Sequence, residues 1–339
     1  MRSLSAIEFT RLELGCSVPI ILFVGCRAVL KLMPASQGLG TPFETLLLGG
    51  SRWLLLGACL VALLYGRSHR RWGRAFVYGL VALVLAGVPE VGAPEEGLRL
   101  VSANLQAYSE EGAAPMEEAL SALEADVLVT LEKRAETLTE MVRVADNFEE
   151  DLARPSHGTA VFCRTGVSCE AVVTPAYGIS TCVMPVALVR VEERLCVVGL
   201  HLPPPVGLCD AGRRPYMDEV VSHLHEGRLS GDWGVCRKSD PVVLVGDLNT
   251  LEGGDVWREF MALGFQDPQR WRGIFGTSWP AGGGWPNLPM LRLDHLLLGK
   301  GLSANHIGYL RIPDSDHKAL VAWLDVSALG AVTGSAASP

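Results

Sequence analysis

Three long apolar stretches near the N-terminus constrain this chain more than any other feature of its sequence. They occupy roughly residues 14–32, 46–65 and 75–91. A helix needs about 20 mostly apolar residues to cross a bilayer, and about 17 at the short limit. The second and third stretches carry one charge each, Arg52 and Glu90, whereas the first contains Arg27, which costs about 2.5–3.5 kcal/mol at the membrane centre. We therefore predict a membrane anchor of about three transmembrane helices in residues 1–96; a cleaved signal peptide or buried core helices are the alternative.

Arginines between the apolar stretches predict the orientation of this anchor. Residues 67–74 contain four arginines, whereas residues 34–45 contain no lysine or arginine. Because positively charged loops stay in the cytoplasm, the arginine loop and the N-terminus are expected inside. The chain after Val91 is then expected outside the membrane.

Charge is distributed as unevenly as hydropathy. The net charge is −8, but residues 1–96 hold 9 basic and 6 acidic residues, and residues 97–326 hold 20 and 31. Proteins that bind duplex nucleic acid normally carry a basic patch, and the second part is strongly acidic. Local basic groups remain candidates for phosphate contacts, at Arg213–Arg214, Arg237–Lys238 and Arg270–Arg272.

Cysteines give a further indication of compartment. Six follow residue 96, at positions 163, 169, 182, 196, 209 and 236. An even number is typical of an exported domain with disulfides, although six cysteines allow 15 pairings. None has the paired CxxC spacing of a zinc site.

Short apolar segments alternate with helical patterns through the rest of the chain. Buried strands are predicted at residues 98–103, 126–131, 195–200 and 242–245, and helices at residues 116–123, 135–144, 216–225 and 256–263. Such alternation without a linker indicates one α/β domain, residues 97–326. The small-residue tail, residues 327–339, is expected to be disordered.

Polar residues stand where the apolar segments stop. Asn104, Glu132, His201, Asp247 and Asn249 follow successive predicted strands, and Asp294–His295 and Asp316–His317 flank two later apolar segments. Strand ends are where side chains of layered α/β proteins converge on a ligand. All these residue types bind metals or phosphates or move protons, so a site is predicted here.

The order of these residues resembles the endonuclease/exonuclease/phosphatase superfamily of deoxyribonuclease I-like enzymes. The matching segments are SANL, LVTLE, HGTAVFCR, VVGLHLPPP, GDLN, RLDHLLL and SDH, which cover residues 98–324. With the predicted anchor, the chain looks like a bacterial membrane-anchored branch of that superfamily. The resemblance implies a four-layer α/β sandwich, two mixed β-sheets flanked by helices. It also implies hydrolysis of a phosphate ester that depends on Mg²⁺ or Mn²⁺.

The resemblance also implies metal ligands and phosphate contacts. Glu132 corresponds to the principal metal ligand, and a carboxylate suits Mg²⁺ or Mn²⁺. Asn104 would support the metal or hold a phosphate oxygen, and Asp316 would complete the metal shell. Asn249 and His201 would contact the phosphate.

Proton transfer falls to the remaining residues of this set. His317 is the candidate general base, or the group that stabilises the transition state. Asp294 would hydrogen-bond its far nitrogen and fix the tautomer, and Asp247 would orient the attacking water or protonate the leaving oxygen. Asp247 and Asn249 share a face if their strand continues, whereas His295 is expected to point away from Asp294.

These inferences predict a phosphohydrolase of the bacterial cytoplasmic membrane with its catalytic domain outside. Its expected partners are the lipid bilayer and a phosphodiester, either nucleic acid or a phospholipid headgroup; no obligate protein partner is inferred. Aromatic residues in the segment 273–289 could stack a base, a sugar or a headgroup, or form a packed loop. The alternative is a non-catalytic membrane-anchored binding or scaffold protein that retains the fold.

Overall fold

A computed structural model describes most of the C-terminal part of the chain. The described residues are 96–106, 113–132, 135–136, 138–147, 158–174, 184–225, 235–269, 276–282 and 290–327. The chain divides into two compact units; the described residues belong to the second, residues 90–250, 256–270 and 276–339, apart from residues 251–255. The three predicted membrane stretches and residues 328–339 lie outside the described residues. Within the described part, no helix has the length and apolar character needed to cross a membrane.

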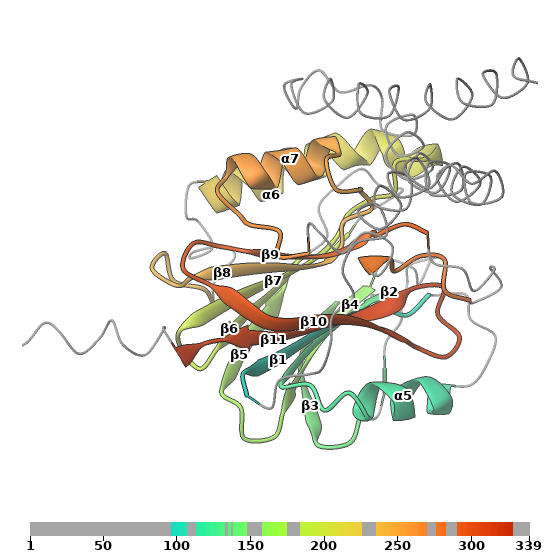
Figure 1. The fold of residues 1–339 in the computed structure, drawn as a ribbon, viewed down its shortest axis with the longest axis vertical. Helices are drawn as coiled ribbons and strands as arrows, with labels where there is room; N and C mark the ends of the chain where they lie inside the picture. The colour runs from blue at the N-terminus through green and yellow to red at the C-terminus, as the bar shows by residue number, and fades with distance from the viewer. Residues whose placement is uncertain are drawn as a thin grey trace, which may run out of the picture. The chain divides into compact units, whose positions relative to one another are not determined.

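Two mixed β-sheets form the centre of this unit (Figure 1). The first has the order β10-β11-β1-β2-β4-β3, and the second β5-β6-β7-β8-β9. In each sheet one parallel pair, β1/β2 or β7/β8, is flanked by antiparallel strands. The strands are β1 (Leu98–Asn104), β2 (Val127–Glu132), β3 (Met141–Asn147), β4 (Gly158–Arg164), β5 (Cys169–Val173), β6 (Ala187–Val191), β7 (Leu195–His201), β8 (Val242–Asp247), β9 (Asp294–Leu298), β10 (Ser303–Arg311) and β11 (Lys318–Asp325).

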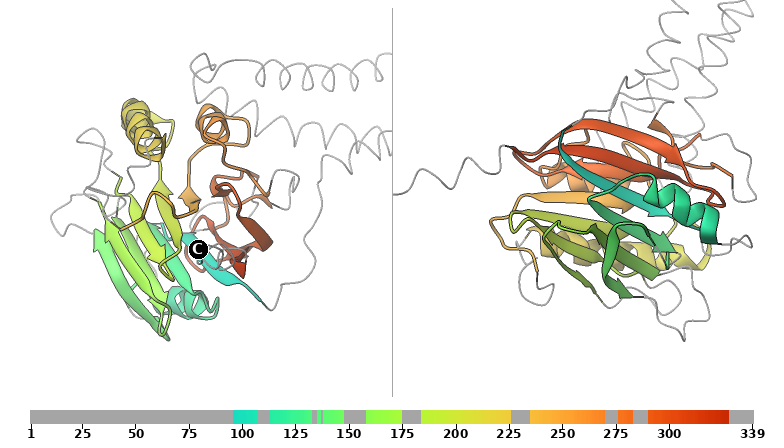
Figure 2. Two further views of the ribbon diagram at one scale, coloured as in Figure 1. Left: turned by 90° about the vertical axis from the view of Figure 1, so that its left-hand side faces the viewer. Right: turned by 90° about the horizontal axis from the view of Figure 1, so that it is seen from below.

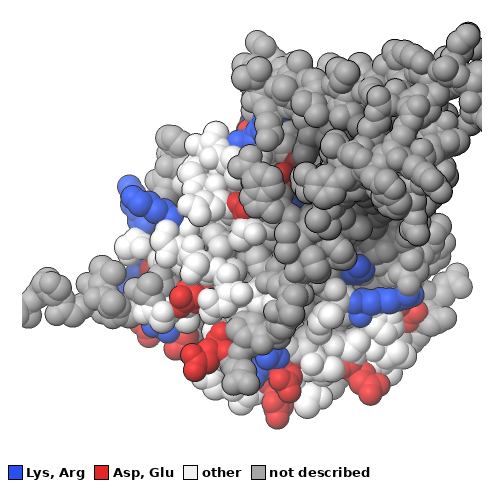
Figure 3. Space-filling view, viewed as in Figure 1, with Lys and Arg blue, Asp and Glu red and all other residues white. Residues whose placement is uncertain are grey.

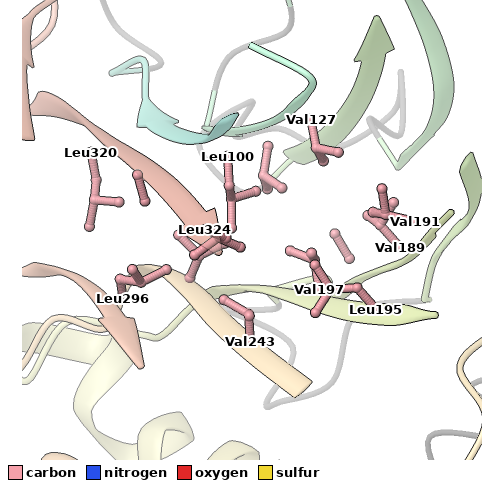
Figure 4. Close-up of a cluster of buried hydrophobic side chains, with 14 of the residues drawn as sticks. Leu100, Val127, Val189, Val191, Leu195, Val197, Val243, Leu296, Leu320 and Leu324 are labelled. Atoms are coloured by element: carbon pink, nitrogen blue, oxygen red, sulfur yellow. The ribbon is translucent and has the colours of Figure 1, made fainter. Parts of the chain in front are cut away.

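An aliphatic core fills the space between the sheets. Alternate residues of the strands meet there, including Leu100, Val127, Val197, Val243 and Leu296 (Figure 4). Because successive strand side chains point to opposite faces, the other half of each strand faces outward. Helices cover the outer faces of both sheets, so strands beneath them are buried on both sides. This explains why the sequences of these strands are almost continuously apolar.

Helices complete the four layers. The helix α5 (Ala113–Ser121) packs Met116 and Leu120 on the outer face of the six-stranded sheet. On the opposite side of the sandwich, α6 (Asp210–His225) and α7 (Asp255–Ala262) cover the five-stranded sheet (Figures 1 and 2). A short 3₁₀ turn, η4 (Gly207–Cys209), precedes α6. The expected four-layer α/β sandwich is therefore present.

The helix predicted at residues 135–144 was wrong. The segment Met141–Asn147 is the edge strand β3, which pairs with β4, and Glu140 before it has a φ of 60°. Its apolar residues, Val142 and Val144, are 55% and 36% exposed, so they do not form a core-facing helical stripe. Hydrogen bonds to β4 decide the conformation here, an instance of tertiary context overriding local pattern.

Disulfides tie parts of this unit together. Cys163 of β4 bonds Cys169 of β5 and so joins the two sheets, while Cys196 of β7 bonds Cys236 in the segment before β8. Cys209 is also disulfide-bonded. These bonds agree with the disulfides expected from the even number of cysteines in the domain.

Candidate active site

Four polar residues occupy the same edge of the space between the sheets. Asn104, His201 and Asp247 are the last residues of β1, β7 and β8, and Asp294 is the first residue of the antiparallel β9. Each lies an even number of positions from a core residue of its own strand, so alternation directs it between the sheets. His201, Asp247 and Asp294 are direct partners in the sheet register. They form one row across the five-stranded sheet.

Glycines allow the backbones to approach each other near this row. A Cβ on Gly199 would lie 2.8 Å from a methyl carbon of Val129 in the facing sheet. Gly246 has a φ of 141°, and a Cβ there would lie 1.9 Å from the carbonyl oxygen of Leu200. Only glycine fits at position 246, which places Asp247 beside β7.

Glu132 reaches the site by a different route. In β2 the odd-numbered residues Val129 and Leu131 face the other sheet, so regular alternation would turn Glu132 outward. Its φ of 69° ends the strand instead, and its Oε1 accepts a hydrogen bond of 2.8 Å from Asn104 Nδ2. The same amide donates to Asp247 Oδ2 at 3.1 Å. Asn104 thus joins carboxylates from the two sheets.

His317 and Asp294 form a buried pair beside this cluster. His317 Nδ1 lies 2.8 Å from Asp294 Oδ2, so the predicted hydrogen bond is confirmed. The other ring nitrogen, Nε2, lies 3.7 Å from Asp247 Oδ2. His295 Nε2 lies 2.9 Å from the carbonyl oxygen of Thr250, away from this pair, as expected from strand alternation.

The surroundings of Asp247 and His317 in this cluster raise the pKa values of both side chains. Burial raises the pKa of Asp247 to about 7; the carboxylates of Asp294 and Glu132 act in the same direction, and the charge of His317 opposes them. Burial by itself lowers the pKa of His317, but the charges of Asp294 and Asp247 and the hydrogen bond to Asp294 outweigh it and raise the pKa to about 10. His317 is therefore charged at neutral pH, whereas Asp247 is close to its midpoint. The resulting pair is a hydrogen-bond donor next to a potential proton acceptor.

His201 lies on the other side of Asp247. Its Nε2 is 3.6 Å from Glu132 Oε1 and 3.9 Å from Asp247 Oδ2, and the side chain is buried. The structure thus brings six of the predicted site residues into one cluster: Asn104, Glu132, His201, Asp247, Asp294 and His317.

Asn249 and Asp316 lie next to this cluster with other immediate partners. The strand β8 ends at Asp247 and does not continue to Asn249, which has a φ of 44°. Its backbone N–H donates to Asp247 Oδ1 at 2.9 Å, forming an Asx turn, and its Nδ2 donates to the carbonyl of Leu202 at 2.9 Å. Asp316 Oδ2 accepts a hydrogen bond of 3.0 Å from Trp279 Nε1. Burial raises the pKa of Asp316, and the charge of His317 opposes that rise.

Supporting residues that sequence reasoning missed fix the backbone of Asp294. Ser278 Oγ accepts hydrogen bonds from the N–H groups of Leu293 and Asp294, at 3.1 and 3.2 Å. The Tyr309 hydroxyl donates to the carbonyl oxygen of Asp294 at 2.8 Å and accepts from Gln269 Nε2 at 2.7 Å. No local pattern marks these residues, because their bonds join segments far apart in the sequence.

Ser315 supports His317 from within the same loop, which connects β10 to β11. Its Oγ donates to the carbonyl oxygen of Asn104 at 2.6 Å and accepts the N–H of His317 at 3.0 Å. Ser315 begins the SDH motif, so the motif itself contains the signal that could have identified it.

Two of the arginines suggested for phosphate contacts, Arg213 and Arg214, have other partners in the structure. Arg213 is buried and donates to the carbonyl oxygens of Pro203 and Leu248, at 2.5 and 3.4 Å. It holds together the loops that follow His201 and Asp247. Arg214 pairs with Asp218 and Glu259, and residues 270–272 lie outside the described residues.

The chemistry of this cluster is compatible with a divalent cation. Glu132, Asp247 and Asp316 supply hard oxygen donors, which Mg²⁺ and Mn²⁺ prefer. Among the described residues, Asp294 Oδ1 is buried without a hydrogen-bond partner. Burial, together with the nearby carboxylates of Asp294 and Glu132, raises the pKa of Asp247, and a cation would offset both effects. Among the described residues, however, no group of three or more His, Cys, Asp or Glu side chains has the arrangement of a preformed metal site.

Known proteins share this architecture. The similar solved structures include the AP endonuclease LMAP from Leishmania major, at a TM-score of 0.53 and 13% identity, covering 70% of this chain and 93% of that one. They also include the 3'-5' exonuclease NExo from Neisseria meningitidis, at a TM-score of 0.50 and 14% identity, covering 67% and 99%. At such low identity the similarity shows the fold alone. No curated protein sequence matches this chain.

A family model provides the assignment that these structures do not. The model of the endonuclease/exonuclease/phosphatase family matches residues 97–317, more than half of the chain. The match extends from the start of the described unit to His317, and so includes all the clustered residues. The chain belongs to the endonuclease/exonuclease/phosphatase family.

Proposed function

We propose that this chain is a membrane-anchored, divalent-metal-dependent phosphoesterase that hydrolyses a phosphodiester. The observation that carries the proposal is the pair of hydrogen bonds by which Asn104 joins Glu132 and Asp247. The His317–Asp294 pair lies beside Asp247. Buried carboxylates and histidines gathered at one sheet edge are costly for folding. Family membership supports phosphoester hydrolysis as the purpose of this arrangement.

The residues divide into a cation-binding group and a proton-handling group. Glu132, Asn104 and Asp316 would hold Mg²⁺ or Mn²⁺, which would supply positive charge at the phosphate oxygens. His317, kept charged by Asp294, donates from Nε2 to a phosphate oxygen and stabilises the negative charge that develops there. His201 contributes a second donor on the phosphate.

Asp247 is the proposed proton acceptor. Burial keeps the pKa of Asp247 above its ordinary value, which suits this carboxylate to orient the attacking water and accept its proton. The leaving oxygen, on the opposite side of the phosphorus, takes its proton from solvent. Asn249 keeps the Asp247 carboxylate in place through the Asx turn. The reaction is a single displacement by water, without a covalent enzyme intermediate.

Location narrows the substrate to phosphodiesters outside the cytoplasm. The arginine loop at residues 67–74 favours an extracytoplasmic domain, and the disulfides support an oxidising compartment. On the face in Figure 3, basic and acidic side chains of the described residues are interspersed, without a continuous basic band. The excess of 31 acidic over 20 basic residues in 97–326 favours a phospholipid headgroup or another small phosphodiester of the bacterial envelope over duplex nucleic acid.

An assay of the full chain in detergent tests the proposal. Bis(p-nitrophenyl) phosphate, single-stranded nucleic acid and phospholipids are offered with Mg²⁺, with Mn²⁺ and with EDTA. We expect turnover that EDTA abolishes and added Mg²⁺ restores. Asp247→Ala and His317→Ala should remove this turnover, whereas Lys300→Ala, at an exposed position, should retain it. Metal-independent turnover, or activity unaffected by the two site substitutions, would contradict the mechanism.

The alternative function is a non-catalytic scaffold that retains the fold. It predicts no turnover of any phosphoester under these conditions.

Orientation is tested separately with reporters fused after Val326. A reporter that works only in the periplasm is expected to be active, and activity from a cytoplasm-dependent reporter alone would refute the proposed orientation.

A further inference from the structure

Two cations stand directly opposite each other next to the catalytic cluster. Arg311, the last residue of β10, is the register partner of Lys318, the first residue of β11. Lys318 directly follows His317 in the chain. Directly opposed residues of an antiparallel pair have Cβ atoms about 4.5–5.5 Å apart, and like charges at such positions destabilise the sheet.

Both side chains lie on the face that leads to the site. The register pair two positions before them, Tyr309 and Leu320, packs against the core between the sheets. Arg311 and Lys318 are two residues further along their strands, so they lie on the same face at its outer end. The hydroxyl of Tyr309, on this same face, donates a hydrogen bond to the carbonyl oxygen of Asp294.

The position of Arg311 depends on a glycine beside the site. A Cβ on Gly282 would lie 2.8 Å from Arg311 Nη2 and 3.6 Å from the carbonyl oxygen of Ser315. The guanidinium therefore rests on bare backbone next to the SDH motif. The same loop is tied to that motif by the hydrogen bond of 2.7 Å from the Ala281 N–H to the carbonyl oxygen of Asp316.

Neither cation has an acidic partner among the residues that the structure describes. The ion pairs of this region join Arg292 to Asp267, and His317 to Asp247 and Asp294. The nearest carboxylate in sequence, Asp316, accepts a hydrogen bond from Trp279. Two adjacent uncompensated cations in a domain with 20 basic and 31 acidic residues over 97–326 are an arrangement that an anion would stabilise.

We propose that Arg311 and Lys318 bind a second phosphate group of the substrate, next to the phosphoester that is hydrolysed. As a description of substrate choice, this inference rests on the proposed function. Arg311 offers a planar fork that suits bidentate phosphate contacts, and Lys318 adds a point charge. The preferred substrate is then a diester that carries an additional phosphomonoester, either on a nucleotide or on a lipid headgroup.

Calorimetry on the full chain in detergent with EDTA tests anion binding without requiring catalysis. Pyrophosphate and orthophosphate are titrated into the parent protein, Arg311→Gln and Lys318→Gln. The control is Lys300→Gln, which makes the same charge change in the turn between β9 and β10, at the end of β10 opposite to Arg311. Loss of a charged phosphate contact corresponds to roughly tenfold weaker binding. We expect that weakening of pyrophosphate binding for Arg311→Gln and Lys318→Gln, with Lys300→Gln unchanged.

A second variant keeps the test informative if a substitution disturbs the fold. Arg311→Lys retains the charge, so it is expected to recover part of the pyrophosphate affinity lost in Arg311→Gln, and thermal unfolding identifies any variant that is not folded. Equal pyrophosphate affinity for Arg311→Gln and Lys300→Gln, both folded, would overturn the proposal.

Turnover of matched substrates identifies the source of the second phosphate. One pair is the p-nitrophenyl ester of thymidine 5'-phosphate with and without a 3'-phosphate; the other is phosphatidylinositol 4-phosphate against phosphatidylinositol in mixed micelles. A preference within either pair, reduced in Arg311→Gln, supports the proposal and assigns the source, whereas turnover without any preference overturns it. Absence of all turnover counts against the proposed phosphoesterase, and calorimetry then decides anion binding by itself.

Discussion

His317 and Asp294 are hydrogen-bonded across the two sheets, with 2.8 Å between Nδ1 and Oδ2. Asp294 begins β9 of the five-stranded sheet, whereas His317 immediately precedes β11 of the six-stranded sheet. The pair therefore depends on how the sheets pack and not on either strand alone. Substitutions that alter the charge of this pair or its backbone supports should have separable effects.

Removing the charge of Asp294 should abolish most of the activity without unfolding the protein. Asp294→Asn keeps the shape of the side chain but no longer stabilises the imidazolium of His317, so the pKa of His317 should fall from about 10. We expect kcat to decrease by about 10²–10⁴-fold, by analogy with other His–Asp pairs. Steady-state kinetics and an NMR titration of the His317 ring measure the two effects. An unchanged His317 pKa would refute the electrostatic account.

Tyr309→Phe should lower kcat through the position of Asp294. The change removes the hydroxyl that donates to the Asp294 carbonyl and accepts from Gln269, and it leaves the ring in place. Loss of such a part-buried hydrogen bond typically costs about 0.5–1.5 kcal/mol. We expect kcat to fall while KM changes little, because the hydroxyl contacts the backbone of Asp294 and not the substrate.

Tyr216→Phe provides the matched control for Tyr309→Phe. Tyr216 is fully buried, and its hydroxyl has no hydrogen-bond partner within the part of the chain that the structure describes. The same substitution there should leave kcat unchanged and stability equal or slightly higher. Comparable losses of kcat in the two variants would show that Tyr309 does not position Asp294.

Gly246→Ala should disrupt the site and the central sheet together. The backbone has a φ of 141°, and the new Cβ would lie 1.9 Å from the carbonyl oxygen of Leu200. Since both strands are buried, relief requires β7 and β8 to separate, and we expect destabilisation of at least about 3 kcal/mol in chemical unfolding. Gly264→Ala is the control: its φ is 92°, but no atom lies within 4 Å of the added Cβ, so it should cost only about 1 kcal/mol. Equal costs would refute the steric explanation.

The strand-end residues were predictable because their signal is local. Short β-branched runs end in Asn104, His201 and Asp247, and period-two alternation then directs these residues toward the facing sheet. Glu132 breaks that alternation through a positive φ, so only the resemblance to the family indicated its role. The alternation likewise separated His295 from Asp294.

Features set by contacts between distant segments were not predictable from local pattern. The edge strand β3 was interpreted as a helix, because its conformation depends on pairing with β4. Asp247 and Asn249 were expected to share a face only if their strand continued, and the Asx turn at Asp247 ends that strand. The supports at Ser278 and Tyr309 act on Asp294 from 16 and 15 residues away, and no periodicity records such contacts.

His295 should make the folded domain sensitive to acid. Burial, together with the charge of Arg292, lowers the pKa of His295 to about 4, although Asp267 and the hydrogen bond to Thr250 oppose this. In the unfolded chain its pKa is about 6.5, so between pH 6.5 and 4 the unfolded state binds the proton and the folded state does not. The stability from the neutral ring is fully present above pH 6.5 and is lost as the pH falls to about 4, an effect of about 3 kcal/mol. Urea unfolding of the parent protein and of His295→Gln at pH 7.5, 5.5 and 4.5 measures this loss of stability. The difference in unfolding free energy between the two proteins should shrink as the pH falls. A difference that does not change with pH would exclude His295 as the source.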